Sequence, residues 1–220
     1  MKRGFTLAET LITLVIIGVV AALTVPTMIA KYQKEQTVTR LKKAYSTLGN
    51  AWQQSHFEFG IPEESMLDIT PQEYFNKYWK KYFEVSKYCD SYQACGYKTY
   101  YPHSFPNGNN TGSAIIIPAW GFSFYTNDGI LYAFRTKQSN NETPSKIIMV
   151  DINGSNGPNR IGKDLFYFDR YDNPPLGIKT NGYDASSSQI NSECSRNGNG
   201  HYCATKIVKD GWQIKDDYPW

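Results

Sequence analysis

The 220-residue chain is 40% hydrophobic and 15% aromatic, which supplies enough apolar side chains for a packed core and excludes global disorder. Its formal net charge is +3, and removing Lys2 and Arg3 would leave 21 basic against 20 acidic residues. This balance excludes the strongly basic surface of a dedicated nucleic-acid-binding protein. The mean hydropathy of −0.51 averages a polar body with an almost wholly apolar first thirty residues.

An uninterrupted apolar run opens the chain. No charged residue occurs from Thr10 to Ala30, and as a helix this stretch would be about 30 Å long, the thickness of a bilayer's hydrocarbon core. A cleavable secretory signal has a shorter apolar core of about 7 to 15 residues and then a small-x-small site, which is not found here. The run therefore predicts a retained transmembrane helix.

Two residues in this region are unusual for a simple anchor. Glu9 lies at the start of the apolar run. A lipid-facing charge near the bilayer centre costs about 2.5 kcal/mol or more, so a neutralising partner is expected for Glu9. Lys2 and Arg3 are within reach, and an ordinary charged flank is one interpretation. Pro26 removes one helical hydrogen bond and predicts a kink or local unwinding between Gly18 and Ala30.

The chain begins with MKRGFTLAETL and continues into the apolar helix, an order that resembles the class III signal of type IV pilins and type II secretion pseudopilins. Members of that family also carry a proline at the place of Pro26. The resemblance implies that a prepilin peptidase cuts between Gly4 and Phe5 and methylates the new amino terminus at Phe5. It further implies that Glu9 pairs with the Phe5 amine of a neighbouring subunit, so that the pair selects register during filament assembly.

On this reading residues 1–4 are a leader, residues 5–30 form the transmembrane and assembly helix, and residues 31–220 form an extracytoplasmic domain. We expect a single-pass inner-membrane protein whose partners are the peptidase, other pilin-like subunits and the assembly machinery. The count of basic residues disagrees, because those after the run outnumber the two before it. A large domain translocates largely regardless of its charge, however. The basic residues after the run are Lys31, Lys34, Arg40, Lys42 and Lys43.

The four cysteines form two close pairs, and neither has the C-x-x-C spacing of zinc or thioredoxin-like sites. Export to an oxidising compartment favours disulfides over four buried thiols. Three connectivities are possible, and short local loops favour Cys89 with Cys95 and Cys194 with Cys203.

The sequence predicts an α+β fold in which one long N-terminal helix packs on a small antiparallel sheet, as the pilin resemblance also implies. After Ala30 an apolar stripe continues the helix until Gly60 and Pro62, and it suits packing on the chain's own sheet better than a coiled coil. The stripe consists of Val38, Leu41, Tyr45, Leu48, Trp52 and Ser55.

A capping box at Thr70 and Glu73 predicts a second helix from Pro71 to about Phe83. Its aromatic face suggests core packing and consists of Tyr74, Phe75, Tyr78, Trp79 and Tyr82.

Short apolar segments predict an antiparallel meander, with a hairpin turn at Asn127-Asp128-Gly129. The expected strands are Ala114–Ile117, Gly121–Thr126, Ile130–Arg135, Lys146–Val150 and Leu165–Phe168.

A loop from Asp151 to Asp164 concentrates side-chain oxygens, which calcium prefers, although its spacing departs from an EF-hand. The alternative is a tight loop held by Asx turns. The candidate ligands are Asp151, Asn153, Asn156, Asn159 and Asp164. Major pseudopilins carry calcium in a C-terminal loop, so the resemblance points the same way.

No catalytic motif surrounds the three histidines, which we interpret as surface or hydrogen-bonded core residues: His56, His103 and His201. We therefore expect a structural filament subunit and not an enzyme. The alternative is a membrane-tethered binding module, for calcium or a glycan, that uses the helix only as an anchor. The aromatic segment Gly211–Trp220 is expected to dock on the body of the protein or on a partner.

Overall fold

The computed structural model describes residues 6–60, 69–113, 121–135, 145–171 and 176–220. The chain divides into two compact units, residues 1–36 and residues 37–220. Helix α1 (Leu7–Phe59) contributes to both of them. The second unit contains every other helix and strand.

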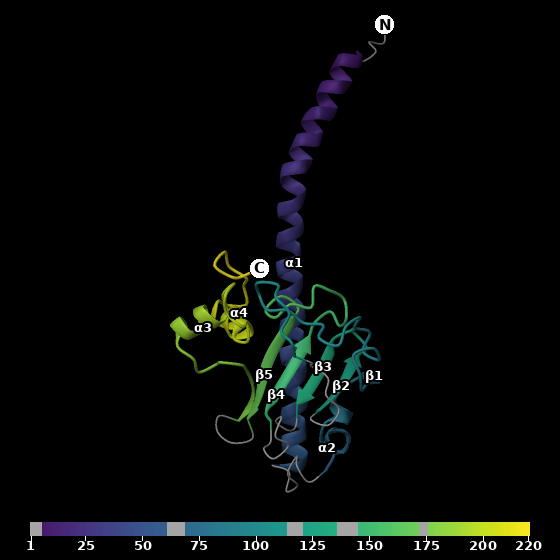
Figure 1. Cartoon of the computed structure of the whole chain (residues 1–220), viewed down its shortest axis with the longest axis vertical. Helices are drawn as coiled ribbons and strands as arrows, with labels where there is room; N and C mark the ends of the chain where they lie inside the picture. Colours follow the sequence, from purple (N-terminus) through teal and green to yellow (C-terminus); the bar gives the residue numbers. More distant parts are fainter. Residues whose placement is uncertain (1–5, 61–68, 114–120, 136–144, 172–175) are drawn as a thin grey trace. The chain divides into compact units, whose positions relative to one another are not determined.

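The second unit is an α+β domain with six antiparallel strands in chain order, so the predicted fold class and meander are confirmed (Figure 1). The predicted hairpin joins β2 to β3. The strands are β1 (Val85–Cys89), β2 (Gly121–Thr126), β3 (Leu131–Arg135), β4 (Ile147–Asp151), β5 (Leu165–Tyr171) and β6 (Gly177–Thr180). The other helices are α2 (Pro71–Tyr78), a 3₁₀ turn at Lys80–Tyr82, α3 (Ser187–Glu193) and α4 (Cys203–Lys209).

Strands β1 and β6 were not predicted from the sequence. They are the two edges of the sheet in the described part of the chain, where one side of the strand has no described neighbour and apolar alternation is not required. In β1 three consecutive side chains are exposed, and β6 has only four residues. The strand expected at Ala114–Ile117 lies outside the described residues.

Helix α1 ends at Phe59, and Gly60 adopts a positive φ of 65°, as expected for a glycine that terminates a helix. Pro62, the other predicted terminator, lies outside the described residues. The capping box of α2 is present, with Thr70 Oγ1 accepting from the Glu73 amide and Glu73 accepting from the Thr70 amide at 2.9 Å. The predicted end near Phe83 was wrong, because α2 stops at Tyr78 and the chain continues as the 3₁₀ turn.

The main core lies between the second part of α1 and one face of the sheet, which Figure 1 shows crossing one another. Leu41 and Leu48 of α1 are fully buried, and Tyr45 stacks on Phe168 of β5 with ring centroids 5.7 Å apart. The expected packing of the amphipathic stripe on the chain's own sheet is therefore confirmed. The predicted aromatic face of α2 is also in this core, with Tyr82 partly buried at its edge.

The opposite face of the sheet is covered by loops. Phe105 and Ile161 pack on Ala133 and Met149, and the loop after β1 packs on Leu131. Both predicted disulfides, Cys89–Cys95 and Cys194–Cys203, are formed, so the alternative of free thiols was wrong.

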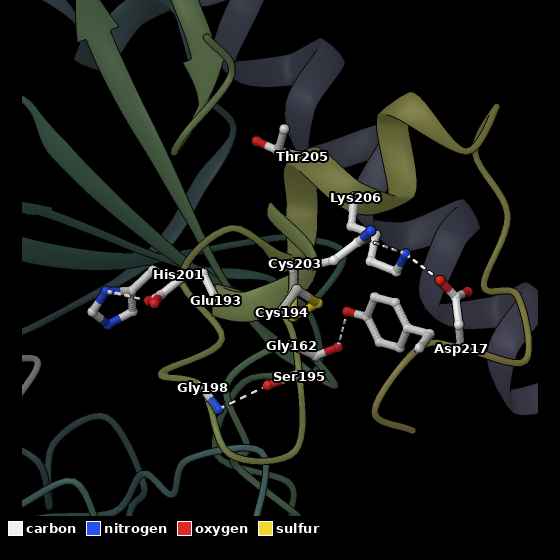
Figure 2. The surroundings of a disulfide bond; sticks show 12 residues. Gly162, Glu193, Cys194, Ser195, Gly198, His201, Cys203, Thr205, Lys206 and Asp217 are labelled. Atoms are coloured by element: carbon white, nitrogen blue, oxygen red, sulfur yellow. Dashed lines mark hydrogen bonds and ion pairs between the residues drawn. A yellow bond between two sulfur atoms is a disulfide. The ribbon is translucent and has the colours of Figure 1, made fainter. Parts of the chain in front are cut away.

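The segment Gly211–Trp220 docks on the body of the domain, which was the first of the two expectations; the second was docking on a partner. Tyr218 is buried and its hydroxyl donates to the Gly162 carbonyl, while Lys206 of α4 pairs with Asp217 at 2.6 Å (Figure 2). The Cys194–Cys203 disulfide lies beside these contacts and joins the end of α3 to the start of α4.

Phe75 of α2 is the aromatic residue on which this core should depend most. It is fully buried, with its ring 4.6 Å from that of Phe122 and 4.7 Å from that of Phe124. Because Phe75→Ala leaves a cavity there, we expect it to lower the free energy of unfolding by about 3–5 kcal/mol. Urea unfolding of the chain without residues 1–30, followed by tryptophan fluorescence, measures this. Phe57→Ala, at a side chain 92% exposed, is the control and should change stability by less than about 0.5 kcal/mol; equal effects of the two changes would contradict the packing described.

Candidate assembly site on the N-terminal helix

The start of α1 is closed by a capping box that the sequence contains but that we did not predict. Glu9 Oε2 accepts hydrogen bonds from both the amide and the hydroxyl of Thr6 at 2.8 Å, and Thr6 Oγ1 accepts from the Glu9 amide at 3.3 Å. The T-x-x-E spacing is the signal that would have revealed it. Glu9 therefore has a local partner within its own chain, in addition to the one that the pilin resemblance implies on a neighbour.

The predicted processing site at Gly4 and Phe5 lies outside the described residues. The assembly residues Glu9 and Pro26 are both on α1, separated by 17 positions of continuous helix. Of the two alternatives expected at Pro26, local unwinding was wrong, because the α-helix continues through the proline without interruption, and the kink stays a prediction. Hydrogen bonding by neighbouring hydroxyls accompanies this continuity, since Thr24 Oγ1 donates to the Val20 carbonyl at 2.9 Å and Thr27 Oγ1 to the Thr24 carbonyl at 2.8 Å.

The first part of α1 exposes an apolar surface. An 18-residue window of this helix has a mean hydropathy of 2.4 and none of it is buried within the structure, so the helix is long and apolar enough to cross a membrane. Its threonines do not interrupt this surface with unpaired hydroxyls, because Thr10 and Thr13 donate to carbonyls of the preceding turn at 2.8 and 2.9 Å. The large exposed side chains are leucine, isoleucine, valine and methionine, including Leu14, Ile17, Val20, Leu23 and Met28.

The predicted calcium loop follows β4, and both of its carboxylates accept hydrogen bonds from the protein. Asp164 accepts from the amides of Asn159 and Arg160 at 2.8 and 2.5 Å. Asp151 accepts from the Tyr97 hydroxyl at 2.8 Å and the Asn153 amide at 3.2 Å. The bond from the Asn153 amide to Asp151, two residues earlier, is the Asx turn that the alternative predicts, and the other three bonds are not of that type.

The same loop retains oxygen atoms without partners. The side-chain oxygens of Asn153 and Asn159 are buried and accept no hydrogen bond among the described residues. Burial raises the pKa of Asp151, and the nearby Asp164 carboxylate raises it further. Asn156 is exposed and its amide donates to the Asn153 carbonyl. Within the described part of the chain no group of three or more acidic, histidine or cysteine side chains is arranged for a metal, so calcium stays a prediction.

The histidines are in three different environments. His56 stacks on Trp52 with ring centroids 4.7 Å apart, and His201 lies against Tyr167 with its Nδ1 3.8 Å from Glu193. His103 is buried, yet neither ring nitrogen has a hydrogen-bond partner among the described residues. The interpretation of a hydrogen-bonded core histidine was therefore wrong for His103.

Comparison with protein families identifies both parts of the chain. Residues 1–25 match the prokaryotic N-terminal methylation motif, and residues 27–220 match a family of unknown function, DUF6613. No protein with a curated description matches the chain. No solved structure matches it.

The first match supports the prepilin-type signal and indicates a type IV pilin-like protein that is processed by prepilin peptidase. With the single apolar helix of α1, it fits an inner-membrane anchor that carries an extracytoplasmic domain. The second match covers most of the residues, and the chain therefore belongs to the DUF6613 family, behind a prepilin-type methylation motif.

Proposed function

We propose that the protein is a structural subunit of a type IV pilus or of a type II secretion-type filament and that it assembles through α1. The observation that supports this most is the combination of the methylation motif with a helix whose apolar surface is not buried by any described residue of its own unit. Stored subunits would expose this surface to lipid, and assembled subunits would bury it against neighbouring helices. Catalysis forms no part of the proposal.

The charge on Glu9 gives the assembly step its specificity. Lipid tails are about as apolar as leucine side chains, so moving α1 from lipid into a bundle of similar helices gains little from the hydrophobic effect alone. Cleavage before Phe5 would create a cationic amine that methylation keeps cationic. A neighbour's amine beside Glu9 would neutralise two charges in an apolar surrounding, whereas a subunit in the wrong register would leave both unpaired.

In a second, independent role, the loop from Asp151 to Asp164 would hold calcium. The unpartnered oxygens of Asn153 and Asn159, beside carboxylates whose pKa burial raises, favour a cation there. The ion would order the loop that follows β4 rather than take part in assembly.

Processing is the first test. After expression with a prepilin peptidase, intact-mass analysis should show loss of residues 1–4 and addition of one methyl group at Phe5. Gly4→Leu is the control and should stay full length, because a bulky side chain replaces hydrogen next to the scissile bond. An uncut wild-type chain beside an active peptidase would favour a tethered binding module instead.

Substitutions of Glu9 separate its charge from its role in the capping box. Glu9→Leu should preserve membrane insertion and folding but lower filament incorporation about tenfold or more. It would leave the Phe5 amine of the neighbouring subunit without its partner, and an unpaired buried charge costs about 3–5 kcal/mol. Glu9→Gln keeps an acceptor for Thr6 without the charge and should be as defective. Thr6→Ala removes the cap but keeps the charge, and should assemble better than either; the fraction of subunit in sheared filaments measures all three. Normal incorporation of Glu9→Gln would rule out the charge pair.

Calcium binding is tested on the chain without residues 1–30. If calcium binds with a dissociation constant of about 0.1 mM, 1 mM calcium should stabilise the domain by about 1.4 kcal/mol and raise Tm by about 3 °C or more. Magnesium at the same concentration is the control and should have less effect, because it dehydrates reluctantly. An unchanged Tm at millimolar calcium would remove the metal from the proposal.

A further inference from the structure

The chain contains six Asn-Gly pairs, and all of them lie in described turns and loops. In such a pair the backbone nitrogen of the glycine can attack the side-chain carbonyl carbon of the asparagine, because glycine has no side chain that hinders the approach. A hydrogen bond from the glycine N–H to the protein has to break before this attack, so the fold decides which pair reacts. The pairs are Asn107-Gly108, Asn153-Gly154, Asn156-Gly157, Asn181-Gly182, Asn197-Gly198 and Asn199-Gly200.

In three of the pairs a backbone carbonyl accepts a hydrogen bond from the glycine amide, which occupies the attacking nitrogen. These bonds run from Gly108 to Phe105 at 2.8 Å, from Gly198 to Ser195 at 3.2 Å and from Gly200 to Glu193 at 2.9 Å.

In two further pairs the asparagine side chain is held by the fold. The Asn181 amide donates to the Asp169 carboxylate at 2.8 Å. The Asn153 amide donates to Asp164 at 3.4 Å, and its side-chain oxygen is buried. Because the side-chain carbonyl carbon has to rotate toward the next backbone nitrogen, these contacts oppose the attack.

The pair Asn156-Gly157 has neither restraint. Both residues are exposed, and the Gly157 amide donates to no acceptor among the described residues. The Asn156 side chain makes one hydrogen bond, from its amide to the Asn153 carbonyl at 2.9 Å, at a surface position where water can replace the acceptor. This pair is the one of the six that combines an exposed asparagine with an unbonded glycine amide.

We propose that Asn156 is a site of spontaneous covalent modification, at which its side-chain amide becomes a carboxylate. A base removes the Gly157 amide proton, and the nitrogen forms a bond to Asn156 Cγ. The bond from Cγ to Nδ2 breaks, and Nδ2 leaves as ammonia after it takes up a proton. Water then opens the five-membered succinimide at one of its two carbonyl carbons, which gives aspartate or isoaspartate.

The modification changes the loop that follows β4. A carboxylate at position 156 cannot donate to the Asn153 carbonyl, and it adds a negative charge between Asp151 and Asp164. The isoaspartate form also lengthens the backbone by one carbon. The reaction needs neither filament assembly nor calcium, so it is independent of the proposed function.

Mass spectrometry tests the proposal on the full chain in detergent. The protein is kept in warm, mildly alkaline buffer made with heavy-oxygen water and a chelator, then digested with pepsin in acid, and each Asn-Gly pair is followed by tandem mass spectrometry. Asn156 should take up heavy oxygen about fivefold faster than Asn107, because the Gly108 amide has to break its bond to Phe105 before it reacts. Asn107-Gly108 is the matched control, since both of its residues are also exposed.

A variant and a denaturant separate the effect of the fold from that of the dipeptide. A Cβ atom at Gly157 would meet no atom within 4 Å, so Gly157→Ala should leave Tm unchanged. It should slow the conversion of Asn156 about tenfold or more, because the methyl group crowds the attacking nitrogen. In guanidinium chloride, which removes the hydrogen bonds of the fold, the rates at Asn156 and Asn107 should converge. The proposal is overturned if Asn156 converts no faster than Asn107 in the folded chain, if Gly157→Ala converts as fast as the wild type, or if the difference between the two sites persists in denaturant.

Discussion

A helix surface of leucine, isoleucine and valine cannot be left in water, and this constraint governs the first part of the protein. Among the described residues of its own unit nothing covers the apolar face of α1. In the proposed filament this helix would exchange lipid for the helices of other subunits, and that exchange would change the hydrophobic free energy little. The polar groups at the start of the helix would then decide which arrangement is favoured, and Glu9 is the only charged one of them among the described residues up to Ala30.

The capping box gives Glu9 one partner within its own chain, and the proposed assembly would add a second. In the single subunit its carboxylate satisfies the Thr6 amide and hydroxyl, so the start of α1 is completed without a neighbour. In a filament the same carboxylate would also accept the amine of the next chain, since one carboxylate has room for several hydrogen bonds. The Glu9 carboxylate would therefore bond to Thr6 in the membrane-held subunit and to both Thr6 and a neighbour's amine in a filament. The capping box is compatible with both states.

Local rules predicted most of the fold. The stripe from Val38 to Ser55, the capping box at Thr70 and the turn at Asn127-Asp128-Gly129 each have a short-range physical cause, and the structure contains all three. Strands β1 and β6 were not predicted, because edge strands need no apolar alternation. The early end of α2 could not be read from its aromatic face, since Trp79 keeps its place in the core after the helix stops.

The candidate sites were predictable to different degrees. Gly4, Phe5 and Glu9 belong to a contiguous motif, which a single sequence can reveal. The proposed reactivity of Asn156 has no such signal, because the chain contains six identical Asn-Gly pairs. What distinguishes Asn156 from Asn107 is whether the next glycine amide finds an acceptor, and only the folded structure provides one for Gly108.

The meander has a consequence for how the domain is made. Each described strand pairs only with the described strands next to it in the sequence, so the sheet can grow one hairpin at a time as the chain crosses the membrane. The buried stripe of α1 comes before every strand that covers it, and Leu41 and Leu48 contact water until β2 to β5 have arrived. Until those strands cover it, this stripe is exposed apolar surface, which favours wrong association.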